Sequence, residues 1–461
     1  MNELHSLEHM ARELCKQNEY DRDQIVESIY DHAAGITANT VTCLDLGRRG
    51  FENRVDNVVT SRLWGFPIMF GLLALIFWIT ITGANYPSAA LADLFFGWEA
   101  WLTNLCQTYH VPAWVHGFFV LGVFRGTAWV VSVMLPPMAI FFPLFTLLED
   151  AGYLPRVAFN MDCLFKKAGV HGKQALTMCM GFGCNAAGII SCRIINSPRE
   201  RLIAILTNNF VPCNGRFPTL IALAGIFFGG SALLSAGNLA ATFVVALLVV
   251  LGVVMTLAVS RVLSQTLLQG EASHFTLELP PYRKPRVGEV IIRSILDRTL
   301  FVMGRAVIIA APAGGIIWIM ANTMIGDVSL ISICASYLDI PAQWMGLDGF
   351  ILLAFILGMP ANEIVLPILI MSYLSGGAMI ELDSLAELRD LFVVEHGWTW
   401  LTALCTMLFA LCHWPCGTTL YTIQKEQKSW KWTIMAALIP TVAGILLCVL
   451  VNGLVSGLHL L

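Results

Sequence analysis

Residues 178–193 hold the most unusual chemistry in the sequence, because a thiol and an amide lie among glycines in an apolar run. Cys184 and Asn185 occupy the middle of this run, which reads MCMGFGCNAAGIISCR. Irregular backbone at membrane depth is tolerated only where protein or water covers its free N–H and C=O groups. The run is therefore predicted to be a broken helix that forms part of a site.

A second break, at residues 358–363, carries the amide of Asn362 and the carboxyl group of Glu363. An ionisable group inside a membrane costs several kcal/mol unless it is paired or hydrated, so it usually marks a pathway. Pairing of Glu363 with Arg216 is the structural alternative. Two Pro-Cys pairs, which end at Cys213 and Cys416, add thiols to later apolar runs.

Mixed sulfur, nitrogen and oxygen donors suit a borderline transition metal such as Fe(II), Zn(II), Mn(II) or Cu(I) better than Mg or Ca. Taken singly, each cysteine is more simply a small buried hydrophobic residue, and the histidine could equally be a core residue. Taken together, they predict a soft ligand set. The predicted metal-facing residues are Cys184, Cys213, Cys416, Glu363, Asn185, Asn362 and His413.

A further set is predicted to line or gate the pathway. Arg216 could instead face an anionic substrate, and the acidic pair at residues 149–150 could be an exit station or simply end a helix. No pairing of a nucleophile with a base predicts an enzyme, and residues 169–174 lack the spacing of a phosphate-binding loop, so no GTP site is expected. The pathway set is Glu149, Asp150, Arg216, Gly181, Gly183 and Pro360.

Composition indicates what must position these residues. The 461 residues are 57% hydrophobic and only 13% charged, whereas a soluble domain has roughly 25% charged residues. Several apolar runs reach the roughly 20 residues that cross a bilayer as a helix. The sequence predicts an all-α polytopic membrane protein with about eight transmembrane helices and two re-entrant hairpins. The 13 cysteines, an odd number, do not suggest a secreted disulfide framework.

Charge distribution gives the predicted topology. Residues 1–62 are a polar helical segment, amphipathic at Leu4, Leu7, Met10 and Leu14, whose arginines place the N-terminus in the cytoplasm. Loops near residues 84–113, 326–348 and 376–396 carry mostly acidic charges and are expected outside. The predicted divisions are 1–62, the first span with its loop over 63–113, a repeat over 114–228, a span with a basic loop over 229–305, a second repeat over 306–423, and a last span over 424–461.

The two repeats share one plan. Each has a span, a break with an asparagine, and a later span with Pro-Cys, in opposite inferred orientations. Opposed repeats whose broken helices meet near the membrane midplane are a recurring transporter design. The sequence therefore predicts that the breaks around Asn185 and Asn362 face each other.

These motifs resemble the membrane region of the ferrous iron transport protein B (FeoB) family, from about Arg54 to the C-terminus. The similar elements are Leu148-Glu149-Asp150-Ala151-Gly152-Tyr153, Gly181-Phe182-Gly183-Cys184-Asn185, Pro212-Cys213-Asn214-Gly215-Arg216, Pro280-Pro281-Tyr282-Arg283 and Pro415-Cys416. The resemblance implies that the two repeats are Gate domains and that Fe(II) is the transported substrate, moving inward through a bacterial inner membrane. Ala186-Ala187-Gly188 and Asn362 depart from the family, which usually has a proline after the first break and a lysine at the second.

The resemblance also implies partners. Family members typically carry an N-terminal GTPase domain, so a separate GTPase or small accessory proteins are expected to assist, with lipid around the chain and self-association left open. No nucleic acid and no permanently bound cofactor are expected. Two alternatives stay open: a carrier of nucleosides or other small solutes, and a non-transporting membrane subunit that recruits a GTPase.

Overall fold

The computed structural model describes residues 24–25, 27–37, 40, 46–61, 63–170, 172–229, 236–270, 282–283, 285–379, 382 and 384–458. The chain divides into two compact units, Met1–Asn57 and Val58–Leu461. In the first, residues 27–37 are helical and α2 (Leu46–Val59) begins. The predicted amphipathic positions Leu4, Leu7, Met10 and Leu14, and the Pro280-Pro281 pair, lie outside the described residues.

Within the described ranges, seven helical segments are long and apolar enough to cross a membrane, and a bent pair makes an eighth if it is counted as one span. The bent pair, α14 (Leu330–Trp344) and α15 (Gly349–Leu357), turns by 109°. The described strands β1 (Met324–Ile325) and β2 (Val328–Ser329) form a two-residue antiparallel ladder. The prediction of an all-α polytopic membrane protein is confirmed.

The first span is longer than predicted. α3 runs from Gly65 to Thr108, and its 44 residues measure about 66 Å at 1.5 Å per residue, twice the roughly 30 Å hydrocarbon core. The expected loop over residues 84–108 is therefore wrong. Those residues are rich in alanine and leucine, which favour helix, and their acidic charges carried no information about secondary structure. The expected loop at residues 326–348 is likewise occupied largely by α14.

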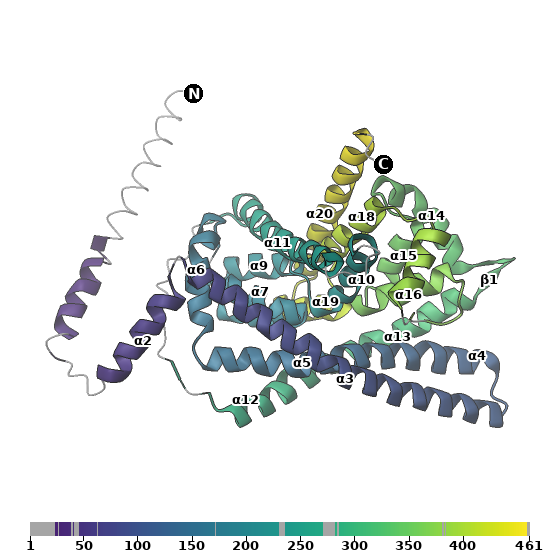
Figure 1. Cartoon of the computed structure of the whole chain (residues 1–461), viewed down its shortest axis with the longest axis horizontal. Coiled ribbons are helices and arrows are strands. Elements are labelled where there is room, and N and C mark those ends of the chain that lie inside the picture. The colour runs from purple at the N-terminus through teal and green to yellow at the C-terminus, as the bar shows by residue number, and fades with distance from the viewer. Residues whose placement is uncertain are drawn as a thin grey trace. The chain divides into compact units, whose positions relative to one another are not determined.

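The first repeat begins with a long helix that pairs with α3, and it continues into broken helices. α3 lies along α5 (Figure 1), which is entered through a short α4 and the π-helix η1. Its helices are α4 (Ala113–His116), η1 (Gly117–Phe124), α5 (Arg125–Asp150), α6 (Leu154–Lys167), α7 (Gln174–Gly183), α8 (Asn185–Ser191), η2 (Cys192–Ile194), α9 (Pro198–Thr207), η3 (Asn208–Phe210), η4 (Asn214–Arg216) and α10 (Phe217–Phe228).

A span and a helical linker lead to the second repeat, which follows the same plan. The linking helices are α11 (Ala236–Gln265), α12 (Val287–Arg293) and η5 (Ser294–Leu300). The second repeat holds α13 (Phe301–Asn322), then α14 and α15, η6 (Asn362–Ile364), α16 (Val365–Tyr373), α17 (Leu385–Arg389), η7 (Asp390–Glu395), α18 (Trp400–Cys412) and α19 (Gly417–Gln427). The last helix, α20 (Trp430–Gly457), follows.

Packing joins the two repeats around a buried centre. The largest hydrophobic cluster includes Trp129 and Phe142 of the first repeat with Phe355 and Phe409 of the second. α19 packs against α8, and α18 packs against α10. The spans that bear the Pro-Cys pairs are not continuous, because α9 and α10, and likewise α18 and α19, are separated by extended residues. Four broken segments therefore converge.

Candidate metal site

The two re-entrant segments break with nearly the same backbone geometry. Cys184 separates α7 from α8 with φ −154° and ψ 125°. Ala361 precedes η6 with φ −151° and ψ 125°. Asn185 and Asn362 therefore occupy equivalent positions, each as the first residue of the helix after its break. The predicted correspondence between these two asparagines is reproduced in the backbone.

The two Pro-Cys breaks also correspond. Cys213 has φ −80° and ψ 167° ahead of η4, and Cys416 has φ −60° and ψ 157° ahead of α19. Proline removes a backbone donor and cannot continue a helix ladder, so each span unwinds just before its cysteine. The extended residue then turns the following helix start toward the centre.

Segments from all four breaks line one buried cavity of about 20 Å³. Three thiols and Glu363 line it, and Glu363 is only 9% exposed. A cavity needs about 10–15 Å³ of this kind of volume to hold one water, so the space suits a single small ion or water. The lining residues are Met134, Met138, Gly183, Cys184, Asn185, Cys213, Asn214, Gly215, Pro360, Ala361, Asn362, Glu363, Cys416 and Thr418.

Asn362 connects the cavity to His413 behind it. The Asn362 amide lies 3.6 Å from Cys213 Sγ and 3.2 Å from His413 Nε2. The other ring nitrogen, Nδ1, is 2.9 Å from the carbonyl oxygen of Ala410, to which it donates. His413 is 1% exposed and does not line the cavity. The structure thus places His413 beside the cavity lining, where it contacts Asn362.

Arg216 lies in the same buried region, where it contacts backbone carbonyl groups and the side-chain oxygen of Asn209 (3.0 Å). Its Nη1 donates to the carbonyl oxygens of Asn209 (2.8 Å) and Leu411 (2.7 Å), and its Nη2 donates to that of His413 (3.2 Å). Between Arg216 and Glu363, both described, no ion pair forms. Its contacts therefore do not support the sequence-based alternative that Arg216 neutralises Glu363.

Asn208 and Asn209, which the sequence analysis missed, bridge the breaks. Asn209 accepts from the Asn185 amide (3.3 Å) and donates to the carbonyl oxygen of His413 (2.6 Å). Asn208 donates to the side-chain oxygen of Asn185 (3.3 Å). A Cβ on Gly181 would lie 3.0 Å from Asn208 Oδ1, so Gly181 provides room for that amide. A polar pair inside an apolar run, separated from Pro212-Cys213 by two residues, was the available signal.

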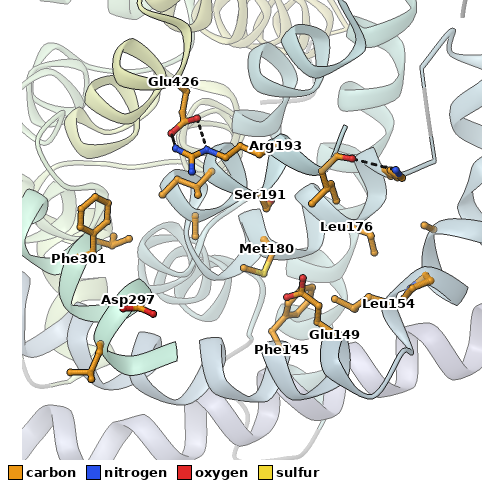
Figure 2. Close-up of a pocket in the computed structure, with 18 of the residues that line it drawn as sticks. Phe145, Glu149, Leu154, Leu176, Met180, Ser191, Arg193, Asp297, Phe301 and Glu426 are labelled. Atoms are coloured by element: carbon orange, nitrogen blue, oxygen red, sulfur yellow. Dashed lines mark hydrogen bonds and ion pairs between the residues drawn. The ribbon is translucent and has the colours of Figure 1, made fainter. Parts of the chain in front are cut away.

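The remaining predicted residues lie in or near a second cavity. This cavity measures about 840 Å³, and Glu149, Arg193, Asp297 and Glu426 are among its lining residues (Figure 2). Asp150 is not among the lining residues; its carboxylate accepts from the backbone N–H of Arg286 (3.3 Å). The predicted site residues thus fall into a small central group and a separate pair at the C-terminal end of α5.

An ion pair in the lining of the larger cavity joins the two repeats. Arg193 Nε and Nη2 donate to the two carboxylate oxygens of Glu426, at 2.8 and 2.6 Å. These hydrogen bonds, with the carboxylate charge, raise the pKa of the Arg193 guanidinium. Arg193 follows the first re-entrant segment and Glu426 belongs to α19, so the pair ties the first break to the second repeat (Figure 2).

The arrangement does not form a complete metal shell. Among the residues that the structure describes, no three His, Cys, Asp or Glu side chains lie together so that they could hold a metal ion. A cation in the central cavity would need amide or thioether donors, or water, as well as the thiols and Glu363. Such an incomplete shell is compatible with a site that must release its ion.

Two family models match the chain. A Gate model, described as nucleoside recognition, matches residues 131–227 and 303–430, and a model of the ferrous iron transport protein B C terminus matches residues 245–297. Together these ranges cover more than half of the chain. The two Gate matches coincide with the two structural repeats, so the protein is a Gate-containing, multi-pass membrane protein.

The chain is also similar to curated proteins named FeoB. The chain is 29% identical over 419 residues to an Fe(2+) transporter FeoB of Staphylococcus aureus (strain MSSA476), which covers 89% of this chain and 60% of the relative. A fusion of Fe(2+) transport protein A with FeoB in Porphyromonas gingivalis is 26% identical over 460 residues, covering 89% and 52%. FeoB of Salmonella typhimurium is 31% identical over 296 residues, covering 63% and 36%.

The chain is similar to the membrane region of the FeoB family, with matches to both Gate segments and to the FeoB C-terminal model. It spans 60% of the length of the first S. aureus relative. No solved structure matches it.

Proposed function

We propose that the chain moves Fe(II), or a related divalent transition metal, across the bacterial inner membrane through the central cavity. The observation that carries this proposal is the convergence of four broken helices on one cavity lined by Cys184, Cys213, Cys416 and Glu363. Opposed broken helices are a recurring way to build a transport site at membrane depth. The names of the relatives, Fe(2+) transporters, support the choice of ion.

The donor set supports a transition metal more than a hard cation. Thiol sulfur favours borderline and soft ions, whereas Mg and Ca prefer shells made of oxygen. Asn185 and Asn362 each present an amide at the start of a helix, where they hold the broken backbone in shape and could add an oxygen donor. With one carboxylate in the lining, the site binds a divalent ion without fully neutralising its charge, which favours release.

The larger cavity supports an inward route with Glu149 as a station near the exit. Gly183 and Pro360 line the central cavity, while Met180 and Ala187 of the first re-entrant segment line the larger one. One short segment therefore separates the two spaces. In this account the segment acts as the inner barrier, and the N-terminus lies in the cytoplasm.

Metal binding to purified protein tests the site. We expect Cys184→Ser and Glu363→Gln each to weaken Fe(II) binding by about tenfold or more, because even residues one shell beyond the ligands have effects of that size. Cys334→Ser on α14 and Glu387→Gln on α17 are matched controls, since neither residue lines the cavity. Unchanged binding in both site variants would show the assignment to be wrong.

An organic solute is the second candidate, favoured by the description of the Gate model and by the 840 Å³ cavity. The central cavity of about 20 Å³ is far smaller than the roughly 300–1,000 Å³ of small-molecule sites. The alternative therefore requires binding in the larger cavity. Inhibition of Fe(II) uptake by added nucleosides would support this alternative. Fe(II) uptake that does not change when nucleosides are added would favour the metal.

We further propose a GTPase partner supplied by a separate chain, together with a small accessory protein. The fusion of transport protein A to FeoB in P. gingivalis is the supporting observation for the accessory protein. Fe(II) uptake should then rise when the proposed GTPase is co-expressed and GTP is present. A purified chain that binds no metal would instead favour a non-transporting subunit.

A further inference from the structure

Two methionines on α5 face the central cavity alongside the three thiols. Met134 and Met138 both line it and are 8% and 4% exposed. They lie four residues apart, and side chains at that spacing share one face of a helix. Pro136 and Pro137 lie between them in the sequence. The same face of α5 therefore brings two thioether sulfurs to the one cavity that the four breaks enclose.

α5 stays helical at this depth, but two prolines remove hydrogen bonds from it. Pro136 and Pro137 provide no N–H groups, so the carbonyl oxygens four residues earlier, those of Ser132 and Val133, lose their usual helical donors. Two carbonyl oxygens of α5 are therefore left without helical donors beside the site.

Thioethers suit this cavity because they can bind a metal without losing a proton. A cysteine must lose its proton to become a strong metal ligand, which is costly in a buried site with little water. A methionine is neutral before and after it binds a metal, and its polarisable sulfur favours softer ions. Glu363 is the one acidic residue in the lining that the structure describes. Two neutral sulfurs can therefore add metal affinity without further charge.

The simpler reading is that these methionines only fill irregular space, as methionine often does. Met371 and Met407 show that role, because they are buried (1% and 0% exposed) in the main hydrophobic cluster and do not line the cavity. Met134 and Met138 are also buried, but they line the cavity and Met371 and Met407 do not. This difference provides a matched comparison within the same chain.

We propose that Met134 and Met138 are specificity-determining residues that make the site prefer Fe(II) over harder divalent ions such as Mn(II) and Mg(II). The proposal rests on the proposed metal transport by this cavity. It assigns a role in ion choice to side chains that contain no titrating group. Cys184, Cys213, Cys416 and Glu363 would still supply the rest of the donor set.

The test replaces sulfur while keeping volume. Met→Leu exchanges nearly conserve volume and usually cost little stability, so Met134→Leu, Met138→Leu and the double variant should fold. The controls are Met371→Leu and Met407→Leu. Each protein is placed in liposomes, and Fe(II) uptake is measured with increasing Mn(II) as competitor. The quantity compared is the ratio of Mn(II) to Fe(II) concentration at which Fe(II) uptake falls to half.

We expect the double variant to lower this ratio by about tenfold, the scale on which groups around a metal change its affinity, while both controls keep the wild-type ratio. The two single variants should show smaller shifts in the same direction. A wild-type ratio in the double variant, with Fe(II) uptake intact, would overturn the proposal and leave metal transport standing. Wild-type protein that takes up no metal would overturn the proposed function, and this inference with it.

Discussion

Arg216 carries a buried positive charge whose partners are backbone carbonyl groups and the side-chain oxygen of Asn209. Its guanidinium donates to the carbonyl oxygens of Asn209, Leu411 and His413. The last two belong to the end of α18, where unpaired carbonyl groups and the helix dipole favour a cation. Arg216 thus satisfies backbone that the Pro-Cys break leaves without helical partners. Its contacts indicate a structural role between the two repeats.

Replacement of Arg216 by lysine tests this role. A single ammonium cannot reproduce the forked geometry of a guanidinium, and at least one buried carbonyl group would lose its donor. We expect Arg216→Lys to lower the free energy of unfolding by about 3 kcal/mol, seen as a lower Tm of the purified protein. Arg193→Lys is the control, because Arg193 is 66% exposed and an exposed pair contributes about 1 kcal/mol or less. Equal Tm changes would contradict the assignment.

For single residues, the sequence predicted which side chains line the cavity better than it predicted their individual hydrogen-bond partners. The thiols, Glu363 and the two asparagines were singled out from residue type and position in a break, and they line one cavity. His413 was expected to face the metal but contacts Asn362 behind the lining. Asn208, Asn209 and the α5 methionines were missed, because their relevance depends on which helices pack together.

The re-entrant segment α7–α8 depends on a glycine at its turn. A Cβ on Gly183 would overlap the ring of Phe141, which packs directly on this backbone from α5. The close approach holds the break of α7 against the helix that carries Met134 and Met138. Gly183 therefore sets the distance between the first break and α5.

A Gly183→Ala substitution should accordingly displace the break. We expect uptake to fall by about tenfold or more, because misplacement by 1 Å can cost two orders of magnitude at a site. The second-site change Phe141→Leu should restore part of the rate by making room. Gly71→Ala serves as the control, since nothing lies within 4 Å of a Cβ at Gly71 on α3. Loss of activity in the control, or full activity in Gly183→Ala, would contradict this role.

At the element scale, breaks were predictable and helix extents were not. Glycine and proline inside apolar runs marked the interruptions near residues 184 and 361. The length of α3 and the presence of α14 were missed, because acidic residues were read as loops although helix-favouring residues surround them. The division of both Pro-Cys spans into two helices was also missed, although the proline before each cysteine was the available signal.

The two Gate matches and the matching backbone geometry at the breaks describe one molecule built from two related halves. Their opposite orientation in the membrane is a prediction from charge distribution. If it holds, the turn after α17 and η7 lies outside and the turn at Lys428 lies inside. The two re-entrant segments then enter from opposite sides.

Epitope insertion tests this topology. Gly397 has an open, exposed turn (φ 64°) with nothing within 4 Å of a Cβ, and Lys428 occupies a left-handed turn between α19 and α20. We expect an antibody to reach an epitope at Gly397 in intact spheroplasts, and one at Lys428 only after permeabilisation. Labelling of the 376–396 region from the cytoplasmic side would refute the inverted arrangement.

The most direct measurement is Fe(II) entry into liposomes that contain this chain, with and without the proposed GTPase partner and GTP. We expect saturable Fe(II) uptake by the wild-type protein, an initial rate at least about tenfold lower in Glu363→Gln, and an unchanged rate in Glu387→Gln. Fe(II) uptake at the wild-type rate in Glu363→Gln, or no Fe(II) entry with the wild-type protein under either condition, would show that the central cavity is not an Fe(II) pathway.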